Sequence, residues 1–292
     1  MGEYPIHRGL GVYLPSLPRP EDLWVEVNQE ITSFLRKDPA RARKLLEAPL
    51  EALHPTDQWV RGMVLDEQQR FELAQLARNA AREGMYTSGY RSAWKSQMRF
   101  VKERLSTMPG PVVDLATGLG SLLEVVLPGT SHQFVGTDVS TRVLLRDQKV
   151  FDHLGWGDRL SFLAFDARHP PFAESSIATL VTNVGLANIE EPGDLLKELR
   201  RVLAGTFAAI MLFYPEEQSL NSEMIRRLNL GALIHREPAL RMFESAGFRV
   251  QVCNSQTVEA QPTPRGEIMP EIQPDRLPVV ATEVEWCTLL AR

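Results

Sequence analysis

The segment Asp114-Leu115-Ala116-Thr117-Gly118-Leu119-Gly120 joins an acidic residue to a glycine-rich turn. It follows the apolar pair Val112 and Val113 and precedes a second apolar run at 122–127. Glycines let the backbone turn sharply and approach a ligand, and a helix that follows offers free N–H groups at its amino terminus. The pattern therefore predicts a strand, a ligand-binding loop and a helix. The expected binding residues of this loop are Asp114, Ala116, Thr117, Gly118 and Gly120.

Short apolar runs alternate with amphipathic segments after this loop, which is typical of a parallel sheet with crossover helices. Strands are expected near 112–115, 133–138, 161–165, 177–182, 207–213, 249–256 and 283–290. The run 207–213 is apolar throughout, as in the middle of a parallel sheet. We therefore predict an α/β fold with a doubly wound, seven-stranded, Rossmann-like sheet whose final strand is antiparallel.

Acidic residues end the second and third of these strands. Asp138 could accept hydrogen bonds from both ribose hydroxyls of an adenosine, and Val139 after it is also an expected binding residue. Asp166 could accept from an adenine amino group while the N–H of Ala167 meets a ring nitrogen. Asp114 would repel a pyrophosphate and suits a cationic ligand. S-adenosylmethionine carries an ammonium, a sulfonium and an adenosine, so its charge and shape fit this pattern.

The stretch from about 110 to 250 resembles the methyltransferase family that includes the ubiquinone and menaquinone C-methyltransferases. The motifs that carry the resemblance are DLATGLG at 114–120, VGTDVS at 135–140, FDARHPPF at 165–172, NVGL at 183–186 and FESAGF at 243–248. It implies a class I, S-adenosylmethionine-dependent methyltransferase. Asp114 and Gly118 would face the methionine end, Asp138 the ribose, and Asp166 with Ala167 the adenine.

The same resemblance implies that Asn183 and Val184 line the methyl-transfer side. The chain departs from the family at Ala116, which replaces the first glycine of the loop, and at 204–206, where a proline and two glycines are usual. The second departure lies in a turn on the far side of the sheet and leaves the predicted cofactor site intact.

The Pro109-Gly110-Pro111 cluster marks a predicted domain boundary. Residues 1–108 would form a mostly helical cap or substrate region, with helices near 21–36, 39–48, 66–84 and 90–106, and residues 109–292 the S-adenosylmethionine-binding domain. The segment 4–15 resembles the closing strand pair of a small zinc-ribbon module. No cysteine accompanies it, so we expect no zinc there and expect the segment to pair with the main sheet or with another chain.

The acceptor side gives weaker signals, and no catalytic residue can be assigned. Tyrosines before the first strand, and polar residues after the fifth, would lie near the cofactor mouth. The six histidines have no metal-ligand spacing, so no metal is expected. The proline-rich segment 262–278 predicts a long loop that could mediate contacts in a homodimer. The candidate substrate residues are Tyr86, Tyr90, Arg91, Tyr214 and His235.

The formal net charge of −5 over 292 residues gives no chain-wide basic field, so nucleic acid is not favoured as a partner. No apolar run is long enough to span a membrane, and we expect a cytoplasmic protein acting on a small molecule. Three alternatives stay open. They are an RNA methyltransferase that uses the basic cluster at 36–44, an aminopropyl transferase, and a non-catalytic binding or partner protein with the same fold.

Overall fold

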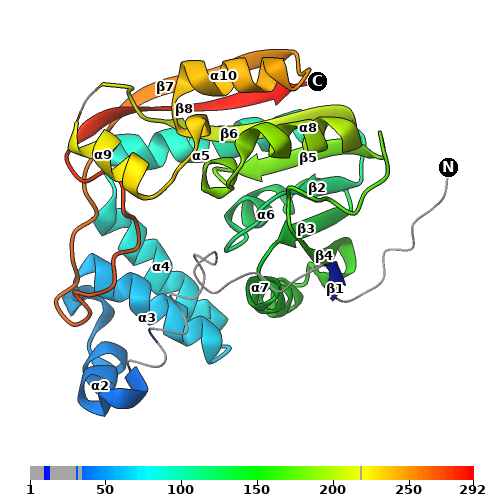
Figure 1. Ribbon diagram of the computed structural model, residues 1–292. Coiled ribbons are helices and arrows are strands. Elements are labelled where there is room, and N and C mark those ends of the chain that lie inside the picture. The colour runs from blue at the N-terminus through cyan, green and yellow to red at the C-terminus, as the bar shows by residue number, and fades with distance from the viewer. Residues whose placement is uncertain (1–9, 14–30, 32–34, 218) are drawn as a thin grey trace.

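The computed structural model describes residues 10–13, 31, 35–217 and 219–292. Its centre is one sheet in the order β1-β4-β3-β2-β5-β6-β8-β7 (Figure 1). β8 runs antiparallel to both of its neighbours, and the other pairings are parallel, which confirms the predicted antiparallel final strand. The strands are β1 (Leu10–Tyr13), β2 (Val112–Asp114), β3 (Phe134–Asp138), β4 (Leu160–Phe165), β5 (Ile177–Asn183), β6 (Leu203–Phe213), β7 (Val250–Ala260) and β8 (Thr282–Ala291).

The sheet has eight strands where seven were expected. The additional strand is β1, which pairs in parallel with β4 and places Leu10 opposite Phe162. This pairing satisfies backbone groups along an edge that would otherwise stay open. Part of the segment compared with a zinc-ribbon strand pair thus joins the main sheet, and the rest of that segment lies outside the described residues.

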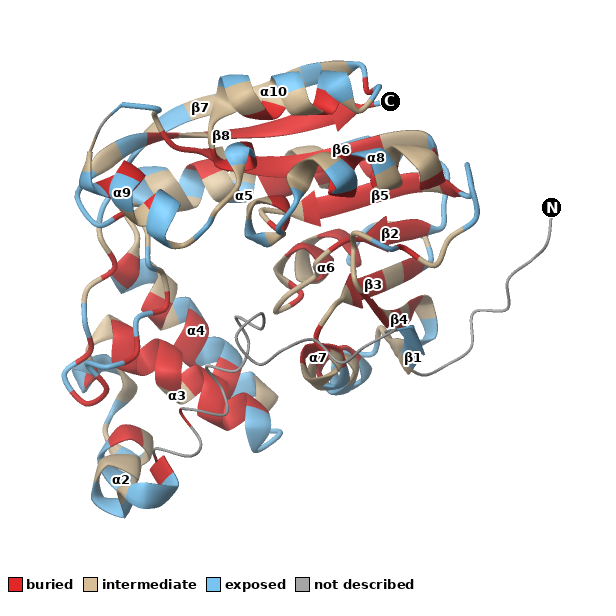
Figure 2. Cartoon of the chain, in the orientation of Figure 1, coloured by how far each residue is buried: buried red, intermediate tan, exposed pale blue. Residues whose placement is uncertain are grey.

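Helices cover both faces of the sheet, because each buries one apolar stripe against it (Figure 2). On one face, α5 (Ser88–Leu105), α6 (Ser121–Val126) and α7 (Thr141–His153) pack over one buried cluster. On the other face, α8 (Pro192–Val202) and α10 (Arg236–Ser245) pack over a second cluster. The doubly wound class is therefore confirmed.

The cap is built from α2 (Pro39–Glu47), α3 (Pro55–Glu67) and α4 (Phe71–Met85), which share a third apolar cluster. The single helix expected at 66–84 is wrong at its start, since the chain breaks at Gln69, where φ is +59°. α3 was missed because it is buried on most sides and has no clear amphipathic period. The helix expected at 21–36 falls largely outside the described residues.

α5 packs on the sheet although it precedes the predicted boundary. The side-chain amide of Gln97 donates to Asn254 O in β7 at 2.7 Å and accepts from Thr288 Oγ1 in β8 at 3.0 Å. The domain division at 108/109 stays a prediction.

The remaining helices are α9 (Leu220–Arg227), which the sequence pattern missed, and the short 3₁₀ turns Leu50–Ala52, Gly157–Arg159, Leu186–Asn188 and Ala232–Ile234.

The segment 261–281, here called the strap, connects β7 to β8 without helix or strand. It extends from the sheet to the cap (orange-red in Figure 1). The carboxylate of Asp57 in α3 accepts hydrogen bonds from the N–H groups of Glu267, Ile268 and Met269 at 2.8–2.9 Å. At its other end, Asn221 of α9 accepts from the N–H groups of 279 and 280. The strap therefore ties the cap to the sheet.

Candidate functional site

The carboxyl ends of β2, β3 and β5 meet at one edge of the sheet, and the glycine loop 115–120 lies there. Gly118 and Gly120 have φ of +57° and +71°, and Ala116 has φ of +52°. Only glycine adopts this left-handed region without cost, so Ala116 adds about 1 kcal/mol of strain. Backbone bonds from Leu115 N to Val181 O and from Thr117 N to Thr137 O fix the loop to its neighbouring strands.

Asp114 ends β2 beneath this loop and is buried. Thr117 Oγ1 donates to its Oδ2 at 3.1 Å, but its Oδ1 has no hydrogen-bond partner among the described residues. Burial raises the pKa of Asp114 to about 8. A buried acceptor without a partner costs free energy until a donor reaches it. A positively charged N–H donor would satisfy this oxygen and would also favour the ionised carboxylate.

Asp138 ends β3 beside the loop. Its Oδ2 accepts from Gly118 N at 3.1 Å and its Oδ1 from Ser140 N at 2.9 Å, so the carboxylate is held in one orientation. Ser140 in turn caps α7 by accepting from Val143 N at 3.4 Å. Burial raises the pKa of Asp138, and the backbone hydrogen bonds oppose that shift. Each carboxylate oxygen keeps a lone pair for a ligand hydroxyl.

Asp166 is engaged within its own turn. Its carboxylate accepts from Arg168 N at 2.9 Å and from the Arg168 guanidinium at 2.8–3.1 Å. Burial raises the pKa of Asp166, but these Arg168 hydrogen bonds outweigh burial and hold it below its ordinary value. The adenine roles of Asp166 and of half-buried Ala167 stay predictions. The ion pair with Arg168 is a competing use of the carboxylate that the sequence pattern did not show.

Asn183 and Val184 follow β5 at the same edge. Trp94 Nε1 of α5 donates to Asn183 Oδ1 at 3.2 Å, so α5 contacts this strand end directly. Val184 has φ of +59°, and its N–H donates to Ile210 O at 3.0 Å. A Cβ added at Gly185 would lie 2.7 Å from Ala116 Cβ, so this turn packs tightly against the glycine loop.

Of the five candidate substrate residues, the structure brings three together. Tyr86 and Tyr90 stack with ring centroids 5.2 Å apart, Tyr90 lies near Tyr214, and all three lie near Asp275. The other two have structural partners. Arg91 forms an ion pair with Glu83 at 2.6 Å. The ring of His235 shares a hydrogen bond with the backbone oxygen of Tyr214 at 2.9 Å and so holds Tyr214 in place.

A buried ionic network connects the cap to the glycine loop, and no sequence pattern indicated it. Asp66 of α3 contacts both Arg78 of α4 and Arg146 of α7. Arg146 also contacts Asp147 and donates to the backbone oxygen of Leu119 in the loop at 3.1 Å. Burial raises the pKa of Asp147 to about 7, although Arg146 opposes the shift. The position of the loop therefore depends on the cap.

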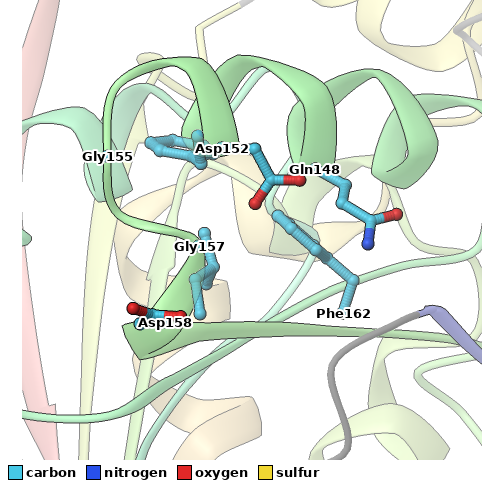
Figure 3. A pocket seen from close by; sticks show the side chains of 8 residues that line it. Gln148, Asp152, Gly155, Gly157, Asp158 and Phe162 are labelled. Carbon is cyan, nitrogen blue, oxygen red and sulfur yellow. The ribbon is translucent and has the colours of Figure 1, made fainter.

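A cavity of about 350 Å³ lies away from this edge, between the end of α7 and the start of β4 (Figure 3). Gln148, Asp152 and Phe162 line it. Ligands of open α/β sheets bind at the carboxyl ends of the strands, whereas this cavity borders the amino-terminal half of β4.

Among the described residues, no group of three or more His, Cys, Asp or Glu side chains could hold a metal. None of the described helices is long and apolar enough to cross a membrane.

Residues 112–205, which span β2 to the start of β6, match the family model of a methyltransferase domain. These residues are therefore similar to a methyltransferase domain. The chain is 29% identical over 123 residues to the ubiquinone/menaquinone biosynthesis C-methyltransferase UbiE of Hahella chejuensis (strain KCTC 2396), a match that covers 41% of this chain and 48% of that protein. The chain thus spans about half the length of the curated relatives it matches.

Solved structures share the fold of the methyltransferase domain. A putative methyltransferase from Bacillus halodurans C-125 superposes with a TM-score of 0.50 at 18% identity, over 68% of this chain and 98% of that one. The [4+2]-cyclase SpnF superposes with a TM-score of 0.51 at 17% identity, over 68% and 80%. The second neighbour is named for a reaction other than methyl transfer, so the activity has to be argued from the site.

Proposed function

We propose that the chain transfers the methyl group of S-adenosylmethionine to a small-molecule acceptor. The observation that carries this proposal is the buried Asp114 carboxylate, whose Oδ1 lacks a partner among the described residues. It lies beneath a loop with left-handed glycines and beside the fixed carboxylate of Asp138. An amino-acid ammonium suits the first carboxylate and a ribose diol suits the second, and S-adenosylmethionine contains both groups.

A cationic residue of the cap complements these two acids. Arg82 of α4 lies over the Trp94 ring at 5.3 Å and donates to Ser121 Oγ, at the start of α6, at 3.4 Å. Burial lowers its pKa, the nearby charge of Glu124 opposes that shift, and no ion pair within 4.0 Å joins Arg82 to another described residue. An unpaired, half-buried guanidinium at the end of the glycine loop is suited to the carboxylate of the same amino-acid moiety.

The chemistry of the bound cofactor would be that of an activated methyl group on a sulfonium. The protein would then contribute mainly orientation and exclusion of water. Asn183, held by Trp94, and Val184 would border the reacting side, and the cap with the strap would shield it. Arg82 comes from α4, so the cap would take part in cofactor binding.

The acceptor is proposed to be a small molecule. The relative from Hahella chejuensis is named for ubiquinone and menaquinone biosynthesis, but only about half of its length is matched, so its substrate is not transferred to this chain.

The RNA alternative relies on the basic cluster at 36–44. Within that cluster, Arg41 pairs with Asp38 and Glu271, and Arg43 pairs with Glu47, which reduces its positive field. No observation favours homodimer contacts through the strap, which packs within its own chain.

Calorimetric titration with S-adenosylmethionine and with S-adenosylhomocysteine tests the proposal. We expect micromolar binding of both, and a loss of at least about tenfold in Asp138→Ala, since a hydrogen-bonded charged group is worth about 1.5–3 kcal/mol. Asp152→Ala, which removes a carboxylate beside the remote cavity, is the matched control and should bind as the wild type does. Absence of binding to the wild type would overturn the proposal.

A further inference from the structure

Four segments of the chain meet around Asp275 of the strap. The hydroxyl of Tyr86, which follows α4, donates to the Asp275 carboxylate, and Thr263 forms a second side-chain hydrogen bond with it. Tyr90 of α5 stacks on Tyr86, and Tyr214 follows β6. The Asp275 charge is close enough to raise the pKa of all three tyrosines, with burial as the larger cause in each case.

The carboxylate of Asp275 lacks a cationic partner among the described residues. No Lys, Arg or His nitrogen lies within 4.0 Å of it in the part of the chain that the structure describes. Burial raises its pKa, although the hydrogen bonds from Tyr86 and Thr263 oppose the shift. Even a half-buried acid without a counter-charge is costly in its ionised form. A ligand that brings a positive charge would remove that cost.

The rings around Asp275 offer the faces that cations prefer. Tyr86 and Tyr90 are nearly parallel, at 12°, and Tyr90 meets Trp286 of β8 edge-on with centroids 5.2 Å apart. An ammonium group over such a ring is attracted by its quadrupole, and sites for amines and quaternary ammonium ions commonly combine several rings. A carboxylate amid three tyrosines therefore fits a ligand with a positively charged nitrogen better than a neutral or anionic one.

An adjoining cavity of about 300 Å³ has the same electrostatic character. Tyr214 lines it together with four glutamates and one arginine. Arg236 pairs with Glu285, which leaves Glu216, Glu237 and Glu283 as the net charge of its wall. A cavity wall with a net negative charge attracts positively charged ligands. The cavity opens at the carboxyl end of β6, on the edge of the sheet that holds the proposed cofactor site.

We propose that Asp275, Tyr86, Tyr90 and Tyr214 form the acceptor site and that the acceptor is an amine. This rests on the proposed methyltransferase function. α5 connects the two sites, because Trp94, one turn beyond Tyr90, donates to Asn183. The ionised Asp275 carboxylate takes one proton from the ammonium of the acceptor, which frees the nitrogen lone pair. That lone pair forms the new N–CH₃ bond as the S–CH₃ bond breaks and its electron pair stays on sulfur.

Binding of a matched probe pair tests the site. Tyramine and 4-ethylphenol differ in the ammonium group, and calorimetry on the full chain saturated with S-adenosylhomocysteine prevents turnover. We expect the wild type to bind tyramine at least about tenfold more tightly than 4-ethylphenol, and Asp275→Asn to lose this preference. Tyr86→Phe, which keeps the ring and removes the hydroxyl, should retain most of it. Glu267→Gln, an exposed change on the same strap, should retain all of it.

The affinity for S-adenosylhomocysteine, measured separately for each variant, distinguishes the two proposals and reports folding. If that affinity is intact and tyramine binds no better than 4-ethylphenol, or does not bind, the amine site is overturned while the cofactor site stands. The amine site is also overturned if Asp275→Asn keeps the full preference. If S-adenosylhomocysteine does not bind the wild type, the methyltransferase proposal itself fails.

Discussion

The cofactor edge and the acceptor side of this molecule are held together in different ways. At the cofactor edge, hydrogen bonds join residues close in the chain, such as Gly118 with Asp138, 20 positions apart, and Ser140 with Asp138, two apart. On the acceptor side, Tyr86 bonds to Asp275 across 189 positions and Asp57 bonds to Ile268 across 211. The strand-ending acid Asp138 of the cofactor edge is thus held by nearby residues, and Arg146 connects the loop to the cap. The acceptor side, in contrast, exists only when cap, strap and sheet have assembled.

The largest loss of unfolding free energy should come from the ionic network around Asp66, which joins the two regions. Asp66→Ala leaves Arg78 and Arg146 buried without their shared acid, and breaking such a pair costs about 3–5 kcal/mol of unfolding free energy. The neighbouring change Glu67→Ala removes a half-exposed ion pair with Arg142 and should cost about 0–1 kcal/mol. Urea unfolding of both variants measures the difference. Equal losses would show that the buried network does not join cap and loop.

The next largest effect should come from the glycine loop. Gly120→Ala places a Cβ 2.7 Å from the Phe151 ring in a residue with φ of +71°, so strain and overpacking together should cost about 2–4 kcal/mol. Gly155→Ala has a similar φ of +78° but an open surrounding, and should cost only about 1 kcal/mol. Denaturant unfolding compares the pair. Similar values for both would mean that packing beneath the loop is not tight.

A smaller effect is expected at the anchor of the strap. Asp57→Ala removes the acceptor of three backbone N–H groups and should cost about 1.5–3 kcal/mol. Amide hydrogen exchange at 267–269 should become faster, while Glu51→Ala, an exposed change nearby, should leave it unaltered. If exchange at these amides does not change, the strap is held by its apolar contacts with the cap and not by Asp57.

Within any single pH unit, the smallest change in unfolding free energy is expected at Asp114. Its pKa is about 8 in the folded chain against an ordinary 3.8, so the folded state holds this proton more tightly than the unfolded state does. The resulting stabilisation is complete below about pH 4 and is lost as the pH rises through about 8. Asp114→Asn should therefore flatten the decline in stability across that window, by up to about 1.4 kcal/mol per pH unit. Equal slopes of unfolding free energy against pH in the wild type and in Asp114→Asn would contradict the raised pKa.

The cofactor edge could be read from the sequence because its signals are local. The acid, the glycines and the strand-ending acids lie within short strand–loop–helix units, and seven of the eight strands were expected from apolar runs. The short strand β1 was not counted, because its four residues join the sheet only through pairing with β4. Asp166 shows the limit of the method, since its pattern suggested a ligand while the structure gives it Arg168 as a partner.

The acceptor side could be read only in part. Tyr86, Tyr90 and Tyr214 were picked out by their position beside predicted strands, but Asp275 lies in an aperiodic segment, and its partner Tyr86 is 189 positions away. The buried acids and arginines of the network look like ordinary helix-surface charges in the sequence. Their pairing depends on how three helices pack, which no local pattern specifies.

Amide hydrogen exchange of the full chain, with and without S-adenosylhomocysteine, tests most directly whether the cofactor binds at this edge. We expect slower exchange at 115–120, 138–140 and 183–185, where loop and strand ends would contact the ligand. We expect no change at 155–162 beside the remote cavity, and changes in the strap only after tyramine is added. Protection confined to the remote cavity, or none at the three strand ends, would show that the cofactor does not bind at this edge.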